Sequence, residues 1–142
     1  MNDQIYRLLV ARPEDRSAAL IQACKMYGIQ AFAVPLTEQR LTEAAKDLPR
    51  LKEYGWVFFT SVNAVNFTAD ILKVDISDFA QNVRFASVGR ATARAIAANY
   101  LPAEIVAERA SSSGLTQSFI SQVSAIESGK VLWICAEKTI GD

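Results

Sequence analysis

The sequence predicts an α/β fold, in which a parallel sheet carries helices on both faces. Short apolar runs alternate with helical patterns along the 142 residues, as in doubly wound proteins. The run 56–59 is apolar throughout, and the run 83–88 is largely so. Each ends in small hydroxyl or glycine residues and is followed at once by a helical pattern. Such a junction is typical of a buried parallel strand that leads into a helix.

The first forty residues predict a βαβ unit and a linker. A strand is expected within 5–11, a helix from Arg12-Pro13 onward, and a second strand over 29–34. Proline favours a first helical turn, and Gly28 ends the helix. The polar segment 36–40 predicts the linker. The expected buried stripe of the helix is Ala18, Ala19, Leu20, Ile21, Ala23 and Cys24.

The remaining residues predict a series of strand–helix units. Strands are expected over 56–59, 83–88, 104–107 and 131–135. Helices are expected over 41–48 with an extension to Tyr54, over 61–74, over 90–99, and from a cap at 110–114 to about 126. Residues 75–80 predict a short helix or turn. The expected inward-facing residues are Ala64, Val65, Phe67, Ile71 and Leu72 in the helix 61–74, and Ala91, Ala95, Ile96 and Ala98 in the helix 90–99.

Composition narrows the classes of function. Fifteen basic residues balance fifteen acidic ones, so there is no long-range attraction to nucleic acid or to an anionic membrane. Histidine is absent, and Cys24 and Cys135 match no zinc spacing, so we expect no metal site and two buried, reduced thiols. No signal peptide or bilayer-spanning run is visible. We therefore expect a soluble, cytoplasmic protein with a small-molecule partner and no nucleic-acid or membrane partner.

The candidate binding residues follow the predicted strands, because ligands of open α/β sheets bind at the carboxyl ends of strands. Thr60, Ser61 and Asn63 follow one strand, and Gly89 and Thr92 follow the next. Hydroxyls and free amides at a helix start bind carboxylates or phosphates. The alternative needs no ligand: Ser61 would cap the following helix, and Gly89 would allow a tight turn.

Two further candidates lie elsewhere in the chain. Arg12 ends the first predicted strand, where it either clamps a carboxylate or faces solvent. Ser112 belongs to a serine run, 111–113, that either caps a helix or contacts a carboxylate.

Taken in order, five segments resemble the uroporphyrinogen-III synthase family. They are ARPEDRSAALIQACKMYGIQAFAVPL, WVFFTSVNAV, VRFASVGRATARAI, ERASSSGL and KVLWICAEK, and they cover nearly the whole chain. The combination of FTSVNAV with VGRATA is the most specific part of the match. One departure is Cys135-Ala136, where many relatives have an arginine–glycine pair.

The resemblance implies a two-domain architecture of flavodoxin-like α/β domains. Residues 1–35 would open the first domain, 36–40 would form a linker, and 41–142 would form an incomplete second domain. Since the chain ends soon after the strand 131–135, we expect it to be truncated and inactive alone, with a tendency to self-associate. The full-length protein is expected to be a monomer.

The resemblance also implies an activity. The family is a cofactor-independent lyase of porphyrin (heme) biosynthesis, which cyclises hydroxymethylbilane to uroporphyrinogen III with inversion of ring D and loss of water. Thr60, Ser61, Asn63, Gly89 and Thr92 would line the substrate cleft, and we add Arg12 and Ser112 as substrate-binding candidates. No catalytic residue is assigned, since the family's tyrosine would lie beyond Asp142. The alternative is a non-catalytic tetrapyrrole-binding or partner-docking module of the same fold.

Overall fold

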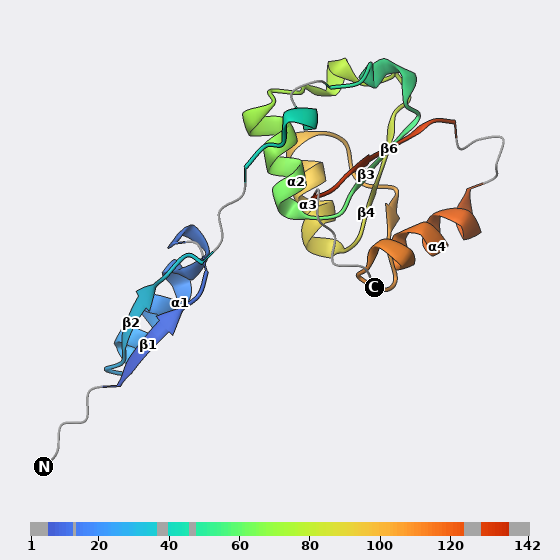
Figure 1. Cartoon of the computed structure of the whole chain (residues 1–142). Helices are drawn as coiled ribbons and strands as arrows, with labels where there is room; N and C mark the ends of the chain where they lie inside the picture. Colours follow the sequence, from blue (N-terminus) through green and yellow to red (C-terminus); the bar gives the residue numbers. More distant parts are fainter. Residues whose placement is uncertain (1–5, 13, 37–39, 46–47, 124–128, 137–142) are drawn as a thin grey trace, which may run out of the picture. The chain divides into compact units, whose positions relative to one another are not determined.

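The chain forms two compact units. The computed structural model describes residues 6–12, 14–36, 40–45, 48–123 and 129–136. Its internal contacts divide the chain into Met1–Arg40 and Leu41–Asp142. Figure 1 shows strands and helices in both units. The predicted α/β class is therefore confirmed.

The first unit is a helix on a two-stranded parallel sheet. Its elements are β1 (Arg7–Val10), α1 (Glu14–Met26) and β2 (Gln30–Ala33). The two strands run parallel, with Leu9 opposite Phe32. Gly28 adopts a φ of +71°, in the left-handed region that glycine reaches at no steric cost. It thereby ends α1 and turns the chain into β2, as predicted.

The predicted buried stripe of α1 is wrong in most positions. Ser17 and Cys24 are buried and Ile21 is half-buried. These positions recur at helical spacing, and they form the single narrow stripe that two strands can cover. The residues expected inside that are instead exposed are Ala18, Ala19, Leu20 and Ala23.

The second unit contains a four-stranded parallel sheet in the order β5-β4-β3-β6. The strands are β3 (Trp56–Phe59), β4 (Arg84–Ser87), β5 (Ile105–Val106) and β6 (Val131–Ile134). All three pairings are parallel, and Phe58 lies opposite both Ala86 and Trp133. The chain moves outward from β3 through β4 to β5 and then crosses to the other side of β3. The strand order therefore reverses at β3.

Helices cover both faces of this sheet. They are α2 (Val62–Asn66), which continues as the π-helical turn η3 (Phe67–Ile71), α3 (Arg90–Asn99) and α4 (Ser112–Gln122). Figure 1 shows α2 and α3 on one side of the strands and α4 on the other. This arrangement matches the flavodoxin-like class that the family resemblance implies.

The strand β3 is the centre of two hydrophobic cores. Val57 and Phe59 point to one face, where they pack with Val65 of α2 and Ile96 of α3. Trp56 and Phe58 point to the other face and pack in the core that contains Leu115 of α4. Every residue of β3 is buried, which explains why this strand reads as an uninterrupted apolar run.

The helix predicted over 41–48, with its extension to Tyr54, is wrong. The described residues there form two single turns of 3₁₀ helix, η1 (Glu43–Ala45) and η2 (Leu51–Glu53). Pro49 lies between these turns. Proline has no backbone N–H to donate, and its ring disfavours helical dihedral angles at the preceding residue, Leu48. A continuous helix is therefore interrupted at this point.

The helix predicted over 61–74 ends earlier, at Ile71. The Leu72 N–H donates to the Phe67 carbonyl at 2.9 Å, which is the wider hydrogen bond of a π turn. Thr68, three residues after the buried Val65, continues the buried face of the helix, whereas Ile71 is 55% exposed. Lys73 then leaves the helix at a φ of 56°. The short helix or turn expected at 75–80 is η4 (Ile76–Asp78).

The helix predicted over 90–99 coincides with α3, but its buried face differs. Thr92 and Ile96 are buried and Ala95 is half-buried, whereas Ala91 and Ala98 are exposed. The helix α4 ends at Gln122, because Val123 adopts extended dihedral angles. The predicted end near residue 126 lies outside the described residues.

Candidate functional site

The ends of the four strands of the second unit place the predicted residues along one edge of the sheet. Thr60 and Ser61 follow β3, and Gly89 follows β4. The Thr60 Oγ1 donates to the Ile134 carbonyl of β6 at 3.4 Å. A methyl group at Gly89 would lie 3.9 Å from Cβ of Ala110, on the link from β5 to α4. The four junctions therefore form a continuous carboxyl edge.

The reversal of strand order marks the middle of this edge. Ligands of open α/β sheets bind at the carboxyl edge where the strand order reverses. Here the order reverses at β3, which pairs with β6 on one side and β4 on the other. Thr60 lies directly after β3, next to Cys135, which is a free and exposed thiol. Cys24 is buried as expected, but the expectation that Cys135 is buried is wrong, because it follows the last paired residue of β6.

Ser61 caps the helix α2. It adopts extended dihedral angles, and its Oγ accepts a hydrogen bond from the Ala64 N–H at 3.1 Å. An accepting hydroxyl keeps its own proton for donation. Ser61 is exposed and Asn63 is half-buried in the first turn of the helix. The capping interpretation is therefore correct for Ser61, and its O–H remains available to a ligand.

Gly89 begins the helix α3 without a side-chain cap. Its φ of 179° is ordinary extended backbone, and a Cβ there would make only normal contacts. The backbone therefore does not require glycine at this position. The first amides of α3 face the edge without a capping oxygen, which suits an acidic ligand. Thr92 is 5% exposed, so most of its side chain lies inside the fold.

The serine run caps α4 through Ser111. The Ser111 Oγ accepts from the Gly114 N–H at 3.0 Å and lies 3.0 Å from the Ser113 Oγ. Ser112 is the half-buried first residue of the helix. A Cβ at Gly114 would collide with the Arg109 carbonyl, so this tight turn requires glycine on steric grounds.

Arg12 lies in the first unit, at the end of β1. Its side chain is exposed, its N–H donates to the Val10 carbonyl, and its own carbonyl accepts from the Ser17 Oγ at 3.3 Å. The other six predicted residues belong to the second unit. Arg94, one helical turn after Arg90, is exposed on α3 and is absent from the predicted set. The spacing of the two arginines in RATAR is the signal that could have found it.

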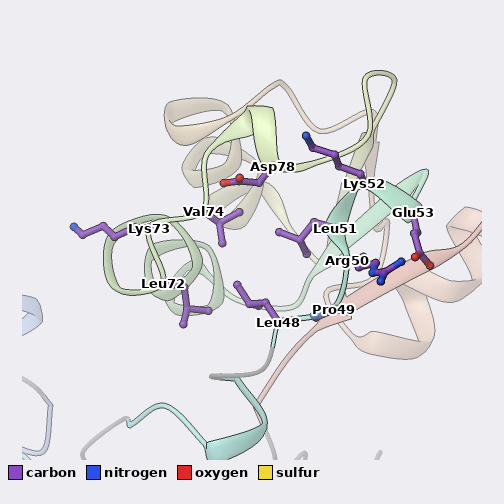
Figure 2. Close-up of a pocket in the computed structure, with 10 residues that line it drawn as sticks. All are labelled: Leu48, Pro49, Arg50, Leu51, Lys52, Glu53, Leu72, Lys73, Val74 and Asp78. Atoms are coloured by element: carbon purple, nitrogen blue, oxygen red, sulfur yellow. The ribbon is translucent and has the colours of Figure 1, made fainter.

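A separate pocket of about 630 Å³ lies at the opposite, amino end of the sheet. Figure 2 shows Leu48, Leu51, Leu72 and Val74 gathered around it, while Lys73 extends away. The residues before β3 and after η3 form this pocket, and none of the predicted binding residues lines it. Its position sets it apart from the carboxyl edge.

The residues that the structure describes contain no group of three or more side chains of the kinds that could ligate a metal ion. In the same ranges, no helix combines the length and the apolar character needed to cross a bilayer.

The fold and the edge define a doubly wound α/β protein with hydroxyl groups and helix starts at its ligand-facing edge. Residues 18–142 match the family model described as uroporphyrinogen-III synthase HemD. The chain therefore belongs to the uroporphyrinogen-III synthase family. The resemblance drawn from the ordered motifs is confirmed.

Two relatives agree with this assignment. The porphyrin biosynthesis protein HemD of Ruminiclostridium josui is 27% identical over 99 residues, which cover 63% of this chain and 19% of the relative. The uroporphyrinogen-III synthase of Chlorobaculum parvum is 31% identical over 88 residues, which cover 60% of this chain and 35% of the relative. The aligned part of the chain thus covers about a fifth of the Ruminiclostridium josui protein. It covers about a third of the Chlorobaculum parvum protein.

Proposed function

We propose that this chain is part of a uroporphyrinogen-III synthase. Such an enzyme closes the linear tetrapyrrole hydroxymethylbilane into uroporphyrinogen III, with inversion of ring D and loss of water, in heme biosynthesis. The observation that carries the proposal is the family match over residues 18–142. The reaction is that of a cyclising hydro-lyase without a cofactor, and we expect it to take place in the cytoplasm.

The carboxyl edge supplies a physical reason for the choice of substrate. The substrate carries several carboxylates, whereas the chain has no net charge. Local donors must then hold the anion, and the uncapped amides of α3 and the hydroxyl of Ser61 are such donors. We propose that Thr60, Asn63, Gly89, Thr92 and Ser112 line the same wall, with Arg12 as a contact from the first domain.

Catalysis in this scheme depends mainly on orientation. Holding the two ends of a flexible chain in reacting geometry converts a conformational search into a local step. We propose the domain division 1–35, 36–40 and 41–142, with further residues of the protein completing both domains. On this view the 142 residues are inactive alone, because the aligned part of the chain covers only 19% of one relative and 35% of the other.

The test is incubation of the gene's complete product with freshly prepared hydroxymethylbilane, followed by separation of the uroporphyrin isomers. We expect the III isomer. The I isomer alone, which forms spontaneously, would refute the proposal, and tight binding of a tetrapyrrole without turnover would favour the non-catalytic binding module. Ser61→Ala should weaken binding of substrate, because it removes a hydroxyl that is free to donate, with Lys52→Gln at the amino end of the sheet as the matched control.

A further inference from the structure

A groove along the outer side of α3 carries two arginines. It has a volume of about 300 Å³ and is lined by Arg90, Ala93, Arg94, Ala97, Pro102 and Ala103. Both arginines are exposed, and neither guanidinium makes an ion pair or hydrogen bond with the residues that the structure describes. The small alanine side chains leave the space between the two long side chains open.

Both arginines lie at positions where a positive charge destabilises the helix α3. Arg90 is the first residue of α3, where the positive end of the helix dipole disfavours a cation. Arg94 repeats the same charge one turn later, and like charges at this spacing destabilise a helix. The first turn of α3 contains no acidic residue. Residues that lower the stability of a helix without a compensating contact are typical of functional positions.

The direction of helical side chains brings both charges toward the carboxyl edge. Each Cα–Cβ bond in a helix tilts toward the helix N-terminus. The side chain of Arg94 therefore extends back along the groove toward Arg90, across one turn of about 5.4 Å. Arg90 adjoins Gly89, which ends the junction after β4. The groove thus opens beside the edge at which we place the substrate.

We propose that this groove binds one carboxylate-bearing side chain of the substrate, with Arg90 and Arg94 as the two donors. The inference rests on the proposed function, since it assigns one acidic arm of the tetrapyrrole to α3. A guanidinium presents paired N–H donors that match the two oxygens of a carboxylate. Bound carboxylate also removes the repulsion between the arginines and complements the start of the helix. The two arginines are binding residues and take part in no covalent step.

The first experiment titrates the 142-residue chain with uroporphyrin I, a stable cyclic tetrapyrrole that carries eight carboxylates, and follows porphyrin fluorescence. Arg90→Gln and Arg94→Gln should each raise Kd roughly threefold to fivefold, and the double variant about tenfold or more. The salt dependence of binding should also become shallower. Arg94→Lys should retain part of the affinity, because it keeps the charge but loses the paired donors. Lys52→Gln, an exposed cation at the far end of the sheet, should leave Kd unchanged.

The second experiment adds glutarate, a simple dicarboxylate, and records the arginine side-chain N–H signals by NMR. Shifts confined to Arg90 and Arg94 would support the groove without reference to tetrapyrroles. If the double variant binds uroporphyrin as tightly as the wild-type chain, the groove is not a binding site, while the proposed function stands. If uroporphyrin does not bind but glutarate shifts both signals, the groove is a carboxylate site that does not hold an arm of the tetrapyrrole, and this proposal is overturned. If neither ligand has an effect, the groove is not a carboxylate site. The proposed function is decided separately, by the isomer assay on the complete gene product.

Discussion

Tyr100 offers a sharp test of the packing in the second unit. Its ring stacks on Phe59 and Phe85, with ring centroids 6.1 Å and 5.4 Å apart, and meets the edge of Phe79 at 5.7 Å. Its hydroxyl donates to the Val74 carbonyl at 3.3 Å. The substitution Tyr100→Phe removes the hydroxyl and keeps the ring. It therefore separates one hydrogen bond from the aromatic packing.

The expected loss at neutral pH follows from that single contact. The hydrogen bond is long and the residue is half-buried, so its removal should lower the free energy of unfolding by about 0.5–1 kcal/mol. The Val74 carbonyl loses its phenolic partner in the variant. Tyr54→Phe is the matched control, because the Tyr54 hydroxyl makes no hydrogen bond with the described residues.

The same residue predicts a dependence on alkaline pH. Burial, together with the charges of Asp70, Asp75 and Asp78, raises the pKa of Tyr100 from 10.0 to about 12. The folded state therefore favours the neutral phenol over the phenolate. This contribution is complete below pH 10 and is lost as the pH rises toward 12. Because water screens a half-buried group, we expect it to amount to about 1 kcal/mol.

Urea unfolding of the wild-type chain and of both variants measures these quantities. The difference between wild type and Tyr100→Phe should be largest at neutral pH and should shrink between pH 10 and pH 12. A parallel ultraviolet titration should show one late-titrating tyrosine that is missing in the variant. Equal stability at neutral pH, or a difference that stays constant up to pH 12, would contradict the account of Tyr100.

Three further substitutions test local features of the second unit, each by the urea midpoint. Gly114→Ala should destabilise the fold by about 1–3 kcal/mol, because the new Cβ collides with the Arg109 carbonyl; an unchanged midpoint would contradict that steric reading. Ser111→Ala should cost about 1 kcal/mol and Ser112→Ala much less, since Ser111 caps α4; the reverse order would move the cap to Ser112. Thr68→Val should cost about 1 kcal/mol, because the Thr68 Oγ1 donates to the Ala64 carbonyl at 2.8 Å; wild-type stability would show that this bond is not needed.

Local sequence patterns predicted the strands and the longer helices of the chain. The apolar run of β3 is visible because all four of its residues are buried, and α3 matches its predicted bounds. The capping role of Ser61 also follows from position alone, since a serine before a helical run is the residue expected there. These features depend on interactions between residues close in the chain.

Burial and site geometry were harder to predict. Ile71 and Ala91 were expected to face inward but are exposed, because the buried faces of the two helices contain Thr68 and Thr92 instead. The preference for apolar residues inside does not predict a buried threonine in advance. The groove beside Arg94 could not be predicted for a related reason, since Pro102 and Ala103 complete it.

The sequence by itself determined the α/β class, the family and the residues that follow each strand. Alternating apolar runs and helix starts are encoded locally, and the ordered motifs carry the family signal over residues 18–142. Only the tertiary structure decided that the chain crosses to the other side of β3 before β6, which places the reversal of strand order beside Thr60. Strand order depends on pairings between residues as far apart as Phe59 and Ile134. Such contacts leave no periodic trace in the sequence, and they are the contacts that bring the separate junctions onto one edge.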